Sequence, residues 1–137
     1  KNKIYIDRDI SPLKKIPERS ISNGAEVKDY LLKKGFISIR LGEINFGEQV
    51  ELFHNADCVV GLHGAGFANL VFCKPGTKVI EFKSSHEYPV IENLAKKNNL
   101  SYSSLVAEAK HIYEYKFPSQ QGHIHIPISS LSKILEK

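Results

Sequence analysis

The chain has 137 residues, a hydrophobic fraction of 42%, a formal net charge of +4 and a pI near 9.0. This length predicts one domain, residues 1–137, with its own core, and the small, scattered basic excess argues against a nucleic-acid-binding protein. No apolar run reaches the roughly 20 residues of a membrane-spanning helix, so we expect membrane association only through parts outside this sequence.

Apolar patterning predicts strands that alternate with helices, without internal repeats. This order is typical of an α/β fold: a Rossmann-like, mostly parallel sheet with helices on both faces. The predicted strands are residues 3–7, 36–41, 58–61, 78–82 and 100–105. One predicted helix begins after Asn23, and others cover 46–55, 68–72 and 89–97. The closing segment, 124–136, is expected to be a docking piece and a final helix.

Helix signals support these assignments. Asn23 with Glu26 three residues later predicts a side-chain cap, and Gly35 after two lysines predicts the end of that helix. Apolar residues at helical spacing put Phe46 and Val90 on the inward faces of their helices. Right-handed crossovers favour the strand order 2-1-3-4-5, which brings the first and third strands together at the ligand-binding edge.

The most informative segment is 57–70, where an apolar run stops at His63 between Gly61 and Gly64. The pattern predicts a strand, a tight loop and a helix. Closely spaced glycines let the backbone approach a ligand, and the first N–H groups of the helix point into the loop. Such a loop suits an anion, above all a phosphate, so Gly64, Ala65 and Gly66 are candidate phosphate-binding residues.

His63 has three interpretations: it bonds a neighbouring carbonyl, binds a metal, or faces the ligand. We favour the third, because His63 stands at the end of a strand and in front of a helix. Asn69, one turn further on, either holds the loop backbone or contacts the ligand. Glu81, near the end of the fourth strand, either accepts hydrogen bonds from ribose hydroxyls or pairs with Arg8.

The connection after the first strand is long for an α/β fold, in which about 2–6 residues are usual. It carries Arg8 and Arg19, and a guanidinium binds two phosphate oxygens at once. The alternative is that both arginines are solvent-facing loop residues.

Metal sites are not expected. His123 and His125 would share one face of a strand, but no third ligand has a recognisable spacing. The two cysteines, Cys58 and Cys73, stand inside apolar runs and are expected to be buried thiols.

Taken together, segments 46–57, 57–70 and 71–82 resemble glycosyltransferase family 61, once described as a domain of unknown function in capsular polysaccharide biosynthesis proteins. The resemblance runs from about residue 3 to 82. It implies inverting transfer of a sugar from a nucleotide-sugar to a glycan or protein acceptor. It also favours an arginine after the first strand and another shortly before an asparagine, which Arg8, Arg19 and Asn23 satisfy, whereas Gly24 replaces the acidic residue usual after that asparagine.

The resemblance implies the C-terminal, donor-binding half of a two-domain (GT-B-type) glycosyltransferase whose N-terminal domain is missing here. His63 would then be the catalytic residue that stabilises the leaving diphosphate, with no tightly bound cofactor and no divalent metal required by this half. The general base is expected from the other half, so the isolated chain should transfer little sugar. The alternative function is a stand-alone nucleotide-binding or regulatory module.

The resemblance also implies a cellular location for the protein. Because capsular enzymes are bacterial and no secretory signal is visible, we expect a cytoplasmic site on the inner face of a bacterial membrane. The alternative is the ER or Golgi lumen.

Overall fold

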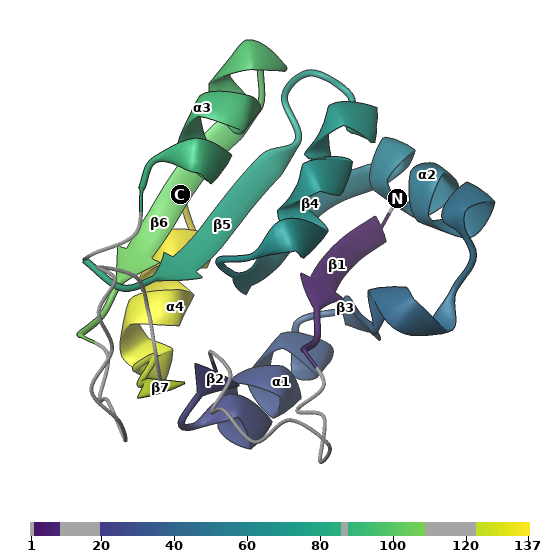
Figure 1. The fold of residues 1–137 in the computed structure, drawn as a ribbon. Coiled ribbons are helices and arrows are strands. Elements are labelled where there is room, and N and C mark those ends of the chain that lie inside the picture. The colour runs from purple at the N-terminus through teal and green to yellow at the C-terminus, as the bar shows by residue number, and fades with distance from the viewer. Residues whose placement is uncertain (1, 9–19, 86–87, 109–122) are drawn as a thin grey trace, which may run out of the picture.

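A computed structural model describes residues 2–8, 20–85, 88–108 and 123–137. Five parallel strands form one sheet in the order β3-β1-β4-β5-β6, and a second, two-stranded sheet pairs β2 with β7 (Figure 1). The elements are β1 (Asn2–Ile6), β2 (Ser20–Ile21), α1 (Gly24–Lys33), β3 (Phe36–Ile39), η1 (Leu41–Glu43), α2 (Phe46–His54), β4 (Ala56–Leu62), η2 (Ala65–Phe72), β5 (Lys78–Lys83), α3 (Val90–Lys97), β6 (Ser101–Val106), β7 (His123–Ile124) and α4 (Ile128–Leu135).

The predicted fold class and strand order are confirmed. The first and third predicted strands are β1 and β4, and they lie side by side with Ile6 opposite Gly61. β1 pairs on its other edge with β3, where Ile6 is opposite Ile39. The sheet therefore reverses its direction of growth at β1, and ligands of such sheets bind beyond the carboxyl ends of the strands at that point.

Helices cover both faces of the sheet, as predicted, because the buried side chains alternate along the strands. On one face, Ile4, Val59 and Val79 pack in a core with residues of α2, η2 and α3. On the other face, Tyr5, Val60 and Ile80 pack with residues of α1 and α4. Figure 1 shows α2 and α3 on one side of the sheet and α1 and α4 on the other.

The predicted side-chain cap of α1 is wrong. Asn23 occupies the N-cap position but makes no cap hydrogen bond. Instead its amide nitrogen donates to the carbonyl of Ile126 at 2.7 Å, and its amide oxygen accepts from the N–H of Ile126 at 2.9 Å. Both polar atoms are thus used to fasten the segment before α4. Gly35 does follow the helix, with the positive φ of 89° expected of a glycine there.

Three local predictions differ from the structure. The side chains of Phe46 and Val90 are 66% and 59% exposed, because each begins its helix and points past the core. The helix after the glycine loop is a 3₁₀-helix that begins at Ala65, three residues earlier than predicted. The strand β3 ends at Ile39, so Arg40 lies at its carboxyl end rather than inside it.

Candidate functional site

The carboxyl edge of the sheet brings together residues that are far apart in the sequence. Asp7 and Arg8 follow β1, Arg40 follows β3, and His63 and Gly64 follow β4. These three strands are neighbours in the sheet. The residues that directly follow β1, Asp7 and Arg8, therefore lie beside the His63 loop, as the predicted strand order requires.

The three glycines of the loop region serve two different purposes. A Cβ at Gly61 would lie 3.1 Å from the Cβ of Ile6, and one at Gly66 would lie 3.0 Å from Cδ1 of Leu41, so both positions are filled by close packing. A Cβ at Gly64 would lie 3.3 Å from Nη1 of Arg8. The missing side chain at Gly64 is what allows the guanidinium to lie directly against the loop.

Two hollows open on this edge. One, of about 450 Å³, is lined by the ends of β1 and β3 and by Gly64 and Gly66. The other, of about 330 Å³, is lined by the ends of β1 and β2 and by the first turn of α1. Five residues line both hollows: Ile6, Asp7, Arg8, Arg40 and Leu62. The two hollows are therefore parts of one cleft, with Arg8 in the wall they share.

Asp7 gathers cations in this cleft. Its Oδ2 lies 3.0 Å from Nζ of Lys28 and 3.6 Å from Nε of Arg40, and it accepts a hydrogen bond from Ser38 at 3.2 Å. The carboxylate is mostly shielded, with its side chain 14% exposed. One anion thus holds two cationic side chains beside Arg8, which is an arrangement suited to an incoming anionic ligand.

His63 is held from behind by a buried acid. Its Nδ1 pairs with Oε2 of Glu81, whose side chain is 1% exposed, and the other oxygen of Glu81 accepts a hydrogen bond from the hydroxyl of Tyr102. Glu81 was expected to meet ribose or Arg8. In the structure both of its oxygens bond within the protein, because β6 places Tyr102 beside it.

Asn69 takes the scaffold position. Its amide nitrogen donates to Oε1 of Gln49 at 2.8 Å, and Gln49 in turn donates to the carbonyls of Leu41 and Ile44 at 3.0 and 3.3 Å. This chain of hydrogen bonds ties η2 to α2 and to the turn after β3. Asn69 therefore supports the walls of the cleft.

Other predicted site residues fall elsewhere. Arg19 lies outside the described residues. Ala65 begins η2 at the loop.

The ring of His123 bonds Oγ of Ser20 across the small sheet, and no group of three or more potential metal ligands occurs in the described part of the chain. Across the described segments, no helix has the length and apolarity needed to cross a membrane.

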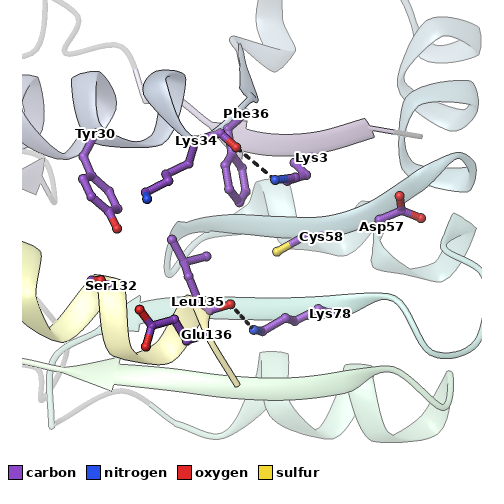
Figure 2. Close-up of a pocket in the computed structure, with 10 residues that line it drawn as sticks. All are labelled: Lys3, Tyr30, Lys34, Phe36, Asp57, Cys58, Lys78, Ser132, Leu135 and Glu136. Atoms are coloured by element: carbon purple, nitrogen blue, oxygen red, sulfur yellow. Dashed lines mark hydrogen bonds between the residues drawn. The ribbon is translucent and has the colours of Figure 1, made fainter.

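A further hollow, of about 340 Å³, lies at the amino edge of the sheet between α1 and α4 (Figure 2). Lys3, Lys34 and Lys78 line it. Nζ of Lys3 donates to the carbonyl of Lys34 at 2.9 Å, and Nζ of Lys78 donates to the carbonyls of Ile134, Leu135 and Lys137 at 2.9 to 3.1 Å. Lys3 and Lys78 thus satisfy carbonyls at the C-terminal ends of α1 and α4, so we assign this hollow a structural role.

Sequence reasoning missed Arg40, Lys28 and Tyr102. The sequence analysis placed Arg40 inside the predicted strand 36–41. The available signal for a site residue was a charge at the end of this strand, which is the neighbour of the first strand. In the strand register, Glu81 lies opposite Ser104, and Tyr102 stands two residues before Ser104. Tyr102 and Glu81 therefore share one face of the sheet. That alternation was available once the fifth strand had been predicted.

The model of the family Glycosyltransferase 61 matches residues 1–80. The chain belongs to glycosyltransferase family 61. It is 29% identical over 87 residues to the EGF domain-specific O-linked N-acetylglucosamine transferase of Gallus gallus, covering 64% of this chain and 15% of that protein. It is 28% identical over 128 residues to the Beta-1,2-xylosyltransferase RCN11 of Oryza sativa subsp. japonica, covering 87% of this chain and 22% of that protein.

These relatives correct one expectation. The bacterial, cytoplasmic location is wrong, because the matching proteins come from a vertebrate and from rice. The name of the Gallus gallus relative specifies EGF domains, which are disulfide-rich modules of oxidising compartments, so that relative fits the lumenal alternative. The chain spans 15% and 22% of the lengths of these two relatives.

Proposed function

We propose that this chain is the nucleotide-sugar-binding domain of a larger glycosyltransferase, with the donor's diphosphate in the carboxyl-edge cleft. The observation that carries the proposal is the contact of Arg8 with Gly64, next to His63. A guanidinium, a glycine loop and an imidazole lie close to the point where the sheet reverses direction, which supports the proposal. Membership of family 61 supplies the class of reaction.

The chemistry of the cleft suits a leaving diphosphate. As the bond from the sugar to the diphosphate breaks, negative charge grows on the terminal phosphate, and prepositioned donors lower the barrier. Arg8 donates two parallel N–H groups. Nε2 of His63, on a ring held at Nδ1 by Glu81, donates one more when the ring carries a proton on both nitrogens. The N–H groups of Ala65 and Gly66 precede the first hydrogen bond of η2, from Phe67 to Gly64, and complete the set.

Transfer in this proposal inverts the anomeric carbon. The rice relative is named for a β linkage, which is the product of inversion from an α-linked nucleotide-sugar. Inversion needs a general base to accept the proton of the acceptor hydroxyl. We assign that base to a second domain, so this chain binds donor without efficient transfer. The acceptor is a glycan or a protein, as the names of the two relatives illustrate.

A thermal-shift experiment tests the binding site. Uridine, guanosine and cytidine diphosphates and the matching monophosphates are added to the chain, with and without Mn²⁺. At about 100 times its dissociation constant, a diphosphate should raise the melting temperature by roughly 5 to 10 °C. His63→Ala should remove most of this shift, whereas the exposed His54→Ala, on α2, should keep it. Equal shifts in both variants, or none in the wild type, would refute the assignment.

The activity is tested in the full-length protein. Transfer of radiolabelled sugar from a nucleotide-sugar should be measurable in the wild type and strongly reduced in His63→Ala. Binding of diphosphate without any transfer by the full-length protein would favour the alternative, a nucleotide-binding or regulatory module. A diphosphate-induced shift of this chain that appears only with Mn²⁺ would contradict the proposal that this half requires no divalent metal.

A further inference from the structure

A buried hydrogen-bond relay runs behind the proposed donor site. The side chain of Glu81 on β5 is 1% exposed, and its two carboxylate oxygens bond to His63 on one side and to Tyr102 on the other. A buried carboxylate is costly to desolvate unless both oxygens find donors. Here each oxygen has a donor, so the three side chains form one satisfied unit.

The direction of the hydrogen bonds in this unit follows from the chemistry of its members. An ionised carboxylate only accepts hydrogen bonds, so the hydroxyl of Tyr102 and Nδ1–H of His63 must both donate. Burial raises the pKa of Tyr102 well above its ordinary value, and its hydrogen bond to Glu81 adds to the effect. The phenol therefore stays a donor throughout the physiological range.

The sheet register explains why Tyr102 reaches Glu81. β5 and β6 are parallel, and Glu81 is opposite Ser104. Tyr102 stands two residues earlier on the same face, so its long side chain runs along the strand to the carboxylate. Its ring also packs against the core on that face. The phenol is anchored by packing, and its hydroxyl fixes one oxygen of Glu81.

We propose that Tyr102 is a positioning residue that holds Glu81, so that Glu81 fixes His63 in the Nδ1–H tautomer and sets the orientation of its ring. Because Glu81 occupies Nδ1, a hydrogen bond from the ring to a ligand would be made through Nε2 of His63. Among the described residues, Glu81 from β5 bonds the ring, Tyr102 from β6 bonds Glu81, and Arg8 from the end of β1 lies against the neighbouring Gly64. The ligand in this inference, a diphosphate, rests on the proposed function.

The test compares Tyr102→Phe with the wild type by nitrogen-15 NMR of the His63 ring. The wild type should show a protonated Nδ1, and Tyr102→Phe should show a clear rise in the Nε2–H form. Tyr30→Phe removes a hydroxyl from a half-buried tyrosine of α1 and serves as the matched control with an unchanged ring spectrum. A backbone amide spectrum confirms that each variant is folded. An unchanged ring spectrum in a folded Tyr102→Phe would overturn the proposal.

Uridine diphosphate provides a second readout. Partners that orient a metal-binding histidine change affinity by about 10- to 100-fold. We expect the lower end of that range here, so the dissociation constant should rise roughly 10-fold in Tyr102→Phe and not in Tyr30→Phe. Equal affinities would also count against the positioning role. If no variant binds any nucleoside diphosphate, the proposed function fails, while the ring spectrum still decides the tautomer.

If Tyr102→Phe does not fold, the wild type alone decides. The hydroxyl proton of Tyr102 should appear as a resolved, slowly exchanging resonance that lies within nuclear Overhauser distance of the proton on Nδ1 of His63. Absence of that resonance at low temperature would overturn the proposal.

Discussion

The two edges of the parallel sheet both carry cationic side chains, but these side chains bond to different partners. At the amino edge, Lys3 and Lys78 donate to carbonyls at the ends of α1 and α4. At the carboxyl edge, Arg40 and Lys28 pair with Asp7, and Arg8 lies against a glycine loop. The number of cations near a hollow is therefore a poorer guide to ligand binding than the protein groups with which those cations bond.

The difference follows from the direction of the chain. In a parallel α/β fold the helices run opposite to the strands, so their C-terminal carbonyls meet the amino edge and their N-terminal N–H groups meet the carboxyl edge. Cations at the amino edge complement the negative ends of helix dipoles. Anions are attracted to the opposite edge, where N–H groups point outward.

The largest expected effect is on thiol labelling, which tests whether the hollow at the amino edge is closed to a reagent. Cys58 lines that hollow, and burial raises the pKa of Cys58 and of Cys73 from 9.0 to about 11. Two pH units leave about 100-fold less thiolate in the neutral range, so labelling by a thiol reagent should be about 100-fold slower in the folded chain than in denaturant. Rapid labelling of Cys58 in the folded chain would show an open hollow and break the comparison.

The same thiols make stability fall at high pH. A raised pKa in the folded state means that the unfolded chain loses the thiol protons first, at about pH 9. The thiols' contribution is fully present below pH 9 and is lost as the pH rises to about 11. Denaturant unfolding across that range should show the decline, and a double Cys→Ser variant serves as the comparison.

Removal of Arg8 sharpens the comparison at the other edge. Arg8→Ala should weaken binding of a nucleoside diphosphate by roughly 30-fold, because a hydrogen bond to a charged group is worth about 1.5–3 kcal/mol. Lys78→Ala, a cation removed from the amino edge, is the control and should bind normally in calorimetric titration. Comparable losses in both variants would mean only that net charge matters.

Removal of Lys78 has the smallest expected effect, and it falls on stability. Three carbonyls at the end of α4 lose their common donor. Water replaces part of that interaction at this partly exposed site, so Lys78→Ala should lower the free energy of unfolding by about 1 kcal/mol. An unchanged free energy of unfolding in Lys78→Ala would contradict this expectation.

Much of the fold follows from the sequence because its patterning is local. Short apolar runs between helical stretches predict parallel strands, and right-handed crossovers then leave few strand orders. The wrong predictions concern residues whose environment depends on tertiary contacts. Asn23 meets Ile126, more than a hundred residues away, instead of capping its own helix. Phe46 and Val90 fit a helical stripe, but each begins its helix beyond the core.

The site was predictable to a smaller extent. The glycines around His63 reveal the loop, since a backbone bend leaves a signal in one segment. The other residues of the site come from other parts of the sheet: Arg40 follows β3, Glu81 lies on β5 and Tyr102 lies on β6. Their roles depend on register, and register is set by packing across the whole sheet.

Amide chemical-shift mapping with nucleoside diphosphates tests the central claim most directly. Uridine, guanosine and cytidine diphosphates are titrated into the labelled chain while backbone N–H signals are followed. The account predicts saturable shifts at Arg8, His63 and Gly64 for at least one of them, with Lys3, Lys34 and Lys78 unchanged. Saturable shifts confined to the three lysines, or no shift at the glycine loop with any diphosphate, would contradict it.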